Sequence, residues 1–172
     1  MLKIKVINDQ KFIELIGNNT FGFLFGEMFD NIEQHSNADN VYLFGQHFSQ
    51  HYYCEICIVD DGQGLYGSLK NANRGVKDSQ DALKKILESG LSAKTEYGEL
   101  IRGTGINNTR IVLTNNEIKG EYFILSGNAA FLQTANSSPE FFTFHDYYWN
   151  GTIVMLKLYK PNSAFNLYNY VK

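Results

Sequence analysis

The chain is poor in cysteine, and its two cysteines are not placed for metal or redox chemistry. Cys54 and Cys57 stand in a stretch typical of a strand, where an odd spacing sends two side chains to opposite faces. A redox Cys-x-x-Cys motif needs a helix start, and no second pair of Cys or His is placed to complete a zinc site. We therefore interpret both cysteines as structural.

The chain also lacks long apolar runs and a strong charge of either sign. No uninterrupted apolar run reaches the ~20 residues that cross a bilayer. The N-terminal sequence Met-Leu-Lys-Ile-Lys-Val is too short and too charged for a secretory signal. A net charge of −3 gives no general attraction to nucleic acid or to an anionic membrane. We expect a cytoplasmic protein that binds neither of them.

What is present is typical of one domain over residues 1–172, without internal repeats or low-complexity segments. Hydrophobic periodicity predicts strands over 2–7, 41–48, 52–59, 121–126, 129–134, 141–148 and 152–159. It also predicts a helix up to Ile16, one that begins at an N-cap on Thr20, and two more over 79–88 and 106–115. These elements predict an α/β (α+β) sandwich of two layers, a mixed and mostly antiparallel sheet with helices on one face. The aromatic tail, 165–170, is expected to pack on the body or on another subunit.

Two polar residues share one face of the helix that is predicted after Thr20. Glu27 and Asn31 are four residues apart, so the carboxylate and the carboxamide lie one above the other. Such a face can hold a metal ion and a water molecule.

Two glycine-containing elements follow along the chain. Asp60-Asp-Gly62-Gln-Gly64 comes directly after an apolar run, so an acidic residue and two glycines fall where a buried strand opens into a turn. Arg102-Gly103-Thr104-Gly105-Ile106 opens a helix, whose free N–H groups attract phosphate. In this order, the helix face and the two elements predict a nucleotide pocket.

These patterns resemble the Bergerat fold of the GHKL ATPases, the superfamily of type II topoisomerases, heat-shock chaperones, mismatch-repair ATPases and sensor histidine kinases. The matching motifs are an N box (Glu27, Asn31, His35), a first glycine box (Asp60, Gly62, Gly64), a second glycine box (Gly103, Gly105, Ile106) and a Gly151-Thr152 turn. The resemblance spans about residues 20 to 160. The chain departs from the family at Asp61, where Asn is common, and its lid sequence matches no one subfamily closely.

The resemblance implies that the chain binds ATP with Mg²⁺. In the family, the Asn of the N box is the magnesium ligand, and the carboxamide oxygen of Asn31 suits this hard cation. Glu27 corresponds to the general base that accepts a proton from water or from a substrate hydroxyl. Asp60 is expected to accept a hydrogen bond from the exocyclic amine of adenine, with the Thr152 hydroxyl nearby. Gly62 and Gly64 are expected to let the backbone turn beside the base.

The resemblance also implies a phosphate site and a mobile lid. Backbone amides of Gly103, Thr104 and Gly105, with Ile106 after them, are expected to approach the phosphates at a helix start. A positive charge is expected from Lys94 or Arg102. The ATP lid is expected over about residues 65–102, where the sequence is polar and rich in glycine around one helix.

Three functions remain open from the sequence. The first is a kinase that phosphorylates a partner protein, similar to the anti-sigma serine kinases or to a histidine-kinase catalytic domain. The second is an ATP-driven switch whose closed form binds a partner or forms a homodimer and is reset by hydrolysis. The third is an inactive interaction module, which the intact motifs argue against. We expect an ATP-binding protein of the histidine-kinase-like class with kinase or ATPase activity.

Overall fold

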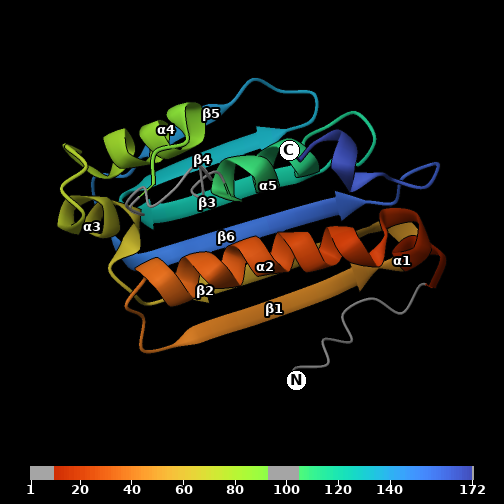
Figure 1. The fold of residues 1–172 in the computed structure, drawn as a ribbon, viewed down its shortest axis with the longest axis horizontal. Coiled ribbons are helices and arrows are strands. Elements are labelled where there is room, and N and C mark those ends of the chain that lie inside the picture. The colour runs from red at the N-terminus through yellow and green to blue at the C-terminus, as the bar shows by residue number, and fades with distance from the viewer. Residues whose placement is uncertain (1–9, 93–104, 172) are drawn as a thin grey trace.

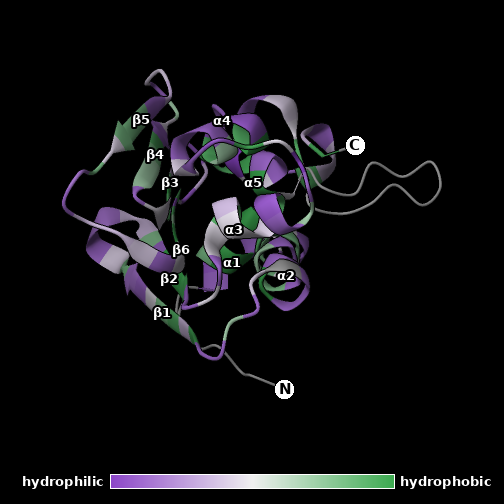
Figure 2. Cartoon of the chain, turned by 90° about the vertical axis from the view of Figure 1, so that its left-hand side faces the viewer, coloured by the Kyte–Doolittle hydropathy of each residue, from purple (hydrophilic) through white to green (hydrophobic). Residues whose placement is uncertain are grey.

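A computed structural model describes residues 10–92 and 105–171 and forms two layers (Figures 1 and 2). The strands are β1 (Val41–Phe48), β2 (Tyr53–Asp60), β3 (Glu121–Gly127), β4 (Ala129–Thr134), β5 (Glu140–Thr143) and β6 (Trp149–Tyr159). The α-helices are α1 (Gln10–Ile16), α2 (Asn18–His35), α3 (Gly64–Asn71), α4 (Ser79–Ser89) and α5 (Gly105–Leu113). The strands form one six-stranded sheet in the order β1-β2-β6-β3-β4-β5, and the helices cover one of its faces. The predicted two-layer sandwich is confirmed.

Every strand pair among the described residues is antiparallel. The strand predicted over residues 2–7 lies outside the described residues. Burial alternates along β2, because its inward side chains face the helices and its outward side chains face away. The register aligns Ile58 of β2, Val154 of β6 and Ile124 of β3 in one inward row, which forms the floor of the core.

The two cysteines follow the predicted alternation. Cys54 is fully buried on the helix-covered face, and burial raises the pKa of its thiol to about 12. Cys57 is half-buried on the opposite face, where it pairs in register with Phe44 and Met155. Both thiols are free. The prediction that they point to opposite faces is confirmed.

The predicted N-cap at Thr20 is wrong, because α2 begins two residues earlier. Gly17 adopts a left-handed φ of 83° and turns the chain between α1 and α2. The Gly17 carbonyl then accepts the backbone N–H of Thr20 at 3.1 Å, as in a helix that has already started. The Thr20 hydroxyl donates backwards to the Ile16 carbonyl at 2.7 Å and is buried. The glycine, and not the threonine, starts the helix.

The polar stretch after Gly64 contains two helices where the sequence predicted one. The predicted helix over 79–88 is α4, which Asp78 caps by accepting the Asp81 N–H at 2.8 Å. The additional helix is α3, whose Leu69 is buried. Both helices therefore pack on the sheet instead of forming a polar loop, and the remainder of the predicted lid, from residue 93, lies outside the described residues.

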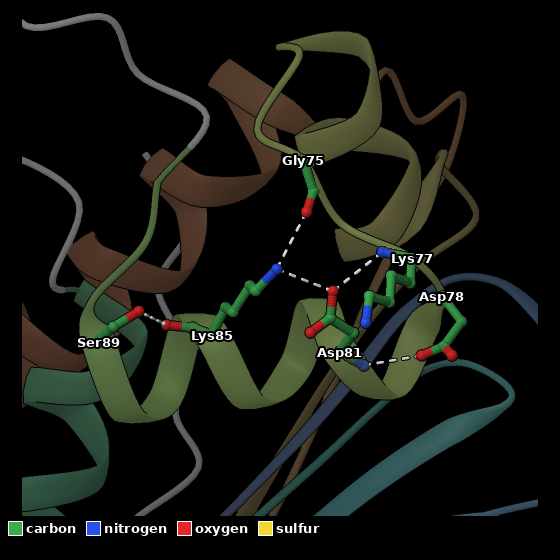
Figure 3. A network of polar contacts seen from close by, with 6 residues as sticks. All are labelled: Gly75, Lys77, Asp78, Asp81, Lys85 and Ser89. Atoms are coloured by element: carbon green, nitrogen blue, oxygen red, sulfur yellow. Dashed lines mark hydrogen bonds and ion pairs between the residues drawn. The ribbon is translucent and has the colours of Figure 1, made fainter.

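One polar network ties the loop between these helices to α4 (Figure 3). The Asp81 carboxylate accepts the Lys77 backbone N–H and the Lys85 ammonium, each at 2.9 Å. Lys85 also donates to the Gly75 carbonyl at 3.0 Å. These contacts hold residues 75–77 against the helix.

Two predictions at the C-terminal end of the chain have different outcomes. The strand predicted over 141–148 is shorter, because β5 ends at Thr143 and 144–148 form an exposed connection to β6. The tail packs on the body, since Phe165 and Leu167 are buried and the Phe165 N–H donates to the Leu15 carbonyl at 2.8 Å. No helix among the described residues has the length and apolar character needed to cross a membrane.

Candidate functional site

A pocket lies between the inward face of the sheet and helices α2, α3 and α4. It holds about 740 Å³ of space free of protein atoms, open solvent at its mouth included. Its walls are mainly apolar and come from Met28, Ile32, Ile58, Leu65, Leu69, Ile86, Leu91, Ile106, Ile124 and Val154. Its polar side chains are Asn31, Ser36, Asp60, Ser68, Ser92 and Thr152. Five predicted site residues therefore line one pocket: Asn31, Asp60, Gly64, Ile106 and Thr152.

Asp60 is the one carboxylate among the described lining residues, and it is only 4% exposed. Burial raises the pKa of this carboxyl group, and hydrogen bonds from Gly62 and Thr152 partly oppose that effect. The Gly62 N–H donates to Asp60 Oδ1 at 2.9 Å, and Thr152 also lowers the pKa of this carboxyl group through its backbone and side chain. The Thr152 hydroxyl donates to Ser126 Oγ at 3.5 Å. An ionised carboxylate has about four acceptor positions, so Asp60 keeps acceptor capacity for a ligand.

The turn after Asp60 packs tightly on the C-terminal end of α2. The Gln63 N–H donates to the Ser36 carbonyl at 2.7 Å. A Cβ at Gly62 would collide with that carbonyl and lie 2.7 Å from its carbon atom. Glycine is therefore required at position 62 by the close approach of the Ser36 carbonyl.

Gly64 and Gly151 meet around Ser126, a residue that the sequence analysis did not select. The Ser126 hydroxyl accepts the Leu65 N–H at 2.8 Å and donates to the Gly151 carbonyl at 2.9 Å. Gly64 has a φ of 67°, and a Cβ there would lie 2.7 Å from Ser126 Oγ. Ser126 thus joins the first turn of α3, the end of β3 and the first residues of β6, where the β3–β6 register shifts.

Gly151 allows the closest backbone approach in the site. Its φ is 115°, a conformation that side-chain-bearing residues rarely adopt. A Cβ at this position would collide with the Asp60 carbonyl oxygen and lie 2.7 Å from the carbonyl carbon. The glycine of the predicted Gly-Thr turn therefore lets β6 close on Asp60.

Asp61, where the GHKL pattern often has Asn, does not line the pocket. Its carboxylate accepts the Asn40 side-chain amide at 2.8 Å and the backbone N–H groups of Asn40 and Asp39 at 2.8 and 2.9 Å. The Asn40 side chain is the largest cause that lowers the pKa of Asp61. Asp61 therefore anchors the loop before β1, whereas the adjacent Asp60 lines the pocket.

Glu27, Asn31 and Gly105 come together where α2 meets the start of α5. The Asn31 side-chain amide donates to the Glu27 carbonyl at 2.7 Å, an arrangement that keeps its Oδ1 atom available as a hard oxygen ligand. A Cβ at Gly105 would collide with Glu27 Oε2 and lie 3.6 Å from Asn31 Nδ2. The positive end of the α5 dipole favours a charged Glu27 carboxylate at this point. Glu27 itself is not among the described residues that line the pocket.

The remaining predicted residues of the phosphate end are Lys94, Arg102, Gly103 and Thr104, and all of them lie outside the described residues. Gly105 is the first residue of α5, and Ile106 is 8% exposed and lines the pocket. Within residues 10–92 and 105–171, no three His, Cys, Asp or Glu side chains gather into a metal-binding group.

Two comparisons with known proteins identify no family for this chain. A scan of the chain against protein-family models found no match, and a search of curated proteins found none.

Proposed function

We propose that this chain is an ATP-binding protein of the histidine-kinase-like, GHKL class, which transfers or hydrolyses the γ-phosphate with Mg²⁺. The observation that carries the proposal is Asp60, a buried carboxylate in an apolar pocket that accepts the Gly62 N–H and keeps acceptor capacity for a ligand. The proposal includes a cytoplasmic location.

The adenine base follows from the chemistry of that acceptor. The exocyclic amine of adenine donates a hydrogen bond, which a carboxylate accepts, and the apolar walls of the pocket suit the faces of the base. Guanine carries a carbonyl oxygen at the same position, and two acceptors would then face each other without a proton. Rejection of guanine is therefore expected to be strong, because a buried polar group would stay unpaired.

Magnesium and the phosphates belong at the other end of the pocket. Asn31 Oδ1 supplies one hard oxygen ligand, which fits a cation that keeps several waters and bridges phosphate oxygens. Bound Mg²⁺ would neutralise charge on the phosphates. Glu27, charged beside the start of α5, would accept the proton of an attacking water or of a hydroxyl on a protein partner.

Calorimetric titration with a non-hydrolysable ATP analogue tests this proposal. We expect saturable, Mg²⁺-dependent binding, and at least ~100-fold weaker binding of the corresponding GTP analogue. Asp60→Ala should abolish binding, whereas Asp61→Ala, which removes the adjacent carboxylate outside the pocket, should bind within about threefold of the wild type. No binding by the wild-type protein, or equal binding by Asp60→Ala, would overturn the assignment.

A second assay separates the two forms of the activity. With γ-labelled ATP, a kinase labels a protein partner, whereas an ATP-driven switch releases phosphate and changes its association with a partner or a second copy. If no labelled partner and no released phosphate are detected, the protein binds nucleotide without turning it over.

A further inference from the structure

The chain has a single tryptophan, and its indole contacts Asp60, which lines the pocket. Trp149 Nε1 donates to the Asp60 carbonyl oxygen at 3.0 Å, across 89 positions of sequence. Trp149 is the first residue of β6 and pairs in register with Gly127 of β3. The indole is half-buried and is not among the described residues that line the pocket, so it contacts Asp60 from outside.

This hydrogen bond adds a side-chain donor at the end of the strand ladder. Asp60 and Thr152 are the last pair in the β2–β6 register. The Trp149 indole donates to the Asp60 carbonyl, and Thr152 lies beside the Asp60 carboxylate, whose pKa it lowers. Residues 149–152 therefore contact both the main chain and the side chain of one aspartate.

We propose that Trp149 is a positioning residue for the nucleotide site: its indole N–H fixes the Asp60 backbone and thereby the direction of the Asp60 carboxylate. This inference rests on the proposed function. Gly151 works in the same sense, since its missing side chain lets the β6 turn close on the Asp60 carbonyl. A carboxylate with a fixed orientation discriminates between bases better than a mobile one, because it cannot rotate to relieve an unfavourable contact with the wrong base.

Trp149→Phe tests the inference, because phenylalanine keeps an aromatic ring and removes only the donor. We expect affinity for ADP to fall about fivefold, the effect of one lost net hydrogen bond, and affinity for GDP to change less than twofold. The ratio of the two affinities should therefore fall. The matched control is Tyr148→Phe, which removes a hydroxyl from the next residue, 60% exposed.

The adenine-to-guanine ratio separates positioning from a general loss of structure. An equal fall in both affinities, together with a lower melting temperature, would overturn the inference, as would an unchanged ratio in folded Trp149→Phe. Wild-type protein is titrated in parallel. If the wild type binds no ADP, the proposed function fails and this inference fails with it; if only the ratio stays constant, the inference fails alone.

A measurement on the wild-type protein keeps the inference falsifiable even if Trp149→Phe does not fold. A ¹⁵N-labelled sample has one indole resonance, because the chain has one tryptophan. We expect slow hydrogen exchange of this N–H, and a shift of its resonance on saturation with ADP although the indole lies outside the pocket. Fast hydrogen exchange of the indole N–H would contradict the inference. A resonance that does not shift although ADP binds would contradict it as well.

Discussion

The two ends of the pocket are built in different ways. Around Asp60, close backbone approaches at Gly62, Gly64 and Gly151 and hydrogen bonds from three strands and one helix start come together. Around Asn31, the described contacts are those of Glu27 and Asn31 with each other and with the first residue of α5. Under the proposed function, recognition of the base depends on the sheet, whereas the chemistry depends on a junction of two helices.

Substitutions in the two regions should therefore differ in their effects on folding and on turnover. The region around Asp60 is part of the ladder and the turns, so changes there affect stability and binding together. The helix junction holds its polar groups on the surface of α2, so changes there should leave the fold intact and affect the reaction.

Gly151→Ala should have the largest effect. A left-handed φ of 115° and collision with the Asp60 carbonyl oppose any side chain, so we expect a loss of at least ~3 kcal/mol in the free energy of unfolding and no nucleotide binding. Denaturant unfolding measures the loss. Gly75→Ala is the matched control, because its φ is 63° but nothing lies within 4 Å of the added Cβ; it should cost ~1 kcal/mol. Equal costs would contradict the account of the β6 turn.

Glu27→Gln tests the helix junction. Removal of the base should lower turnover of ATP about 10²- to 10⁴-fold and change affinity for ADP by less than about threefold. Steady-state phosphate release and calorimetry measure the two quantities. Glu33→Gln, an exposed position of the same helix, serves as the control and should turn over normally. Turnover of Glu27→Gln at the wild-type rate would assign the base to another group.

Asp60→Asn should weaken ADP binding about 10- to 100-fold and yet stabilise the protein at neutral pH. Burial raises the folded-state pKa above the ordinary value of 3.8, so the folded protein holds this proton more tightly than the unfolded chain. Wild-type stability therefore falls as the pH rises from about that value through the raised pKa, and the variant lacks this fall. Thermal unfolding across mildly acidic pH measures the difference; parallel curves for both proteins would contradict it.

Asp61→Ala should have the smallest effect, confined to the loop before β1. Hydrogen bonds from Asn40 and Asp39 lower the pKa of Asp61, so its contribution is present above the ordinary value of 3.8 and is lost as the pH falls through the lowered value. The variant should melt at a lower temperature than the wild type at neutral pH and at the same temperature in strong acid. Asp30→Ala, on the exposed face of α2, is the control. A pH-independent difference would show that packing, not charge, is responsible.

Local sequence patterns predicted most of the strands and helices because burial on one face of the sheet imposes alternation directly on the chain. They failed where tertiary contacts decide. Helix α3, with two glycines in eight residues, has weak intrinsic helix propensity, and its buried Leu69 packs in the core. The start of α2 depends on the conformation of Gly17, which a search for capping side chains overlooks.

The same reason explains which site residues were predicted. Asp60 and Asn31 were found because motif order and strand end place them locally, and both line the pocket. Ser126 and Trp149 carried no signal, since their roles arise only when β3 and β6 come together beside β2. The positions of Lys94 and Arg102 lie outside the described residues, so their part in phosphate binding stays a prediction.

The opposite placement of the two cysteines has a practical consequence for spectroscopy. Burial raises the pKa of both thiols, but Cys54 is fully buried, whereas Cys57 is partly accessible on the sheet face away from the helices. A thiol-reactive label is therefore directed to one native position, and that position lies on β2, three residues before Asp60. Labelled wild-type protein can report on ligand binding in the pocket from behind the sheet, where the label cannot block the pocket.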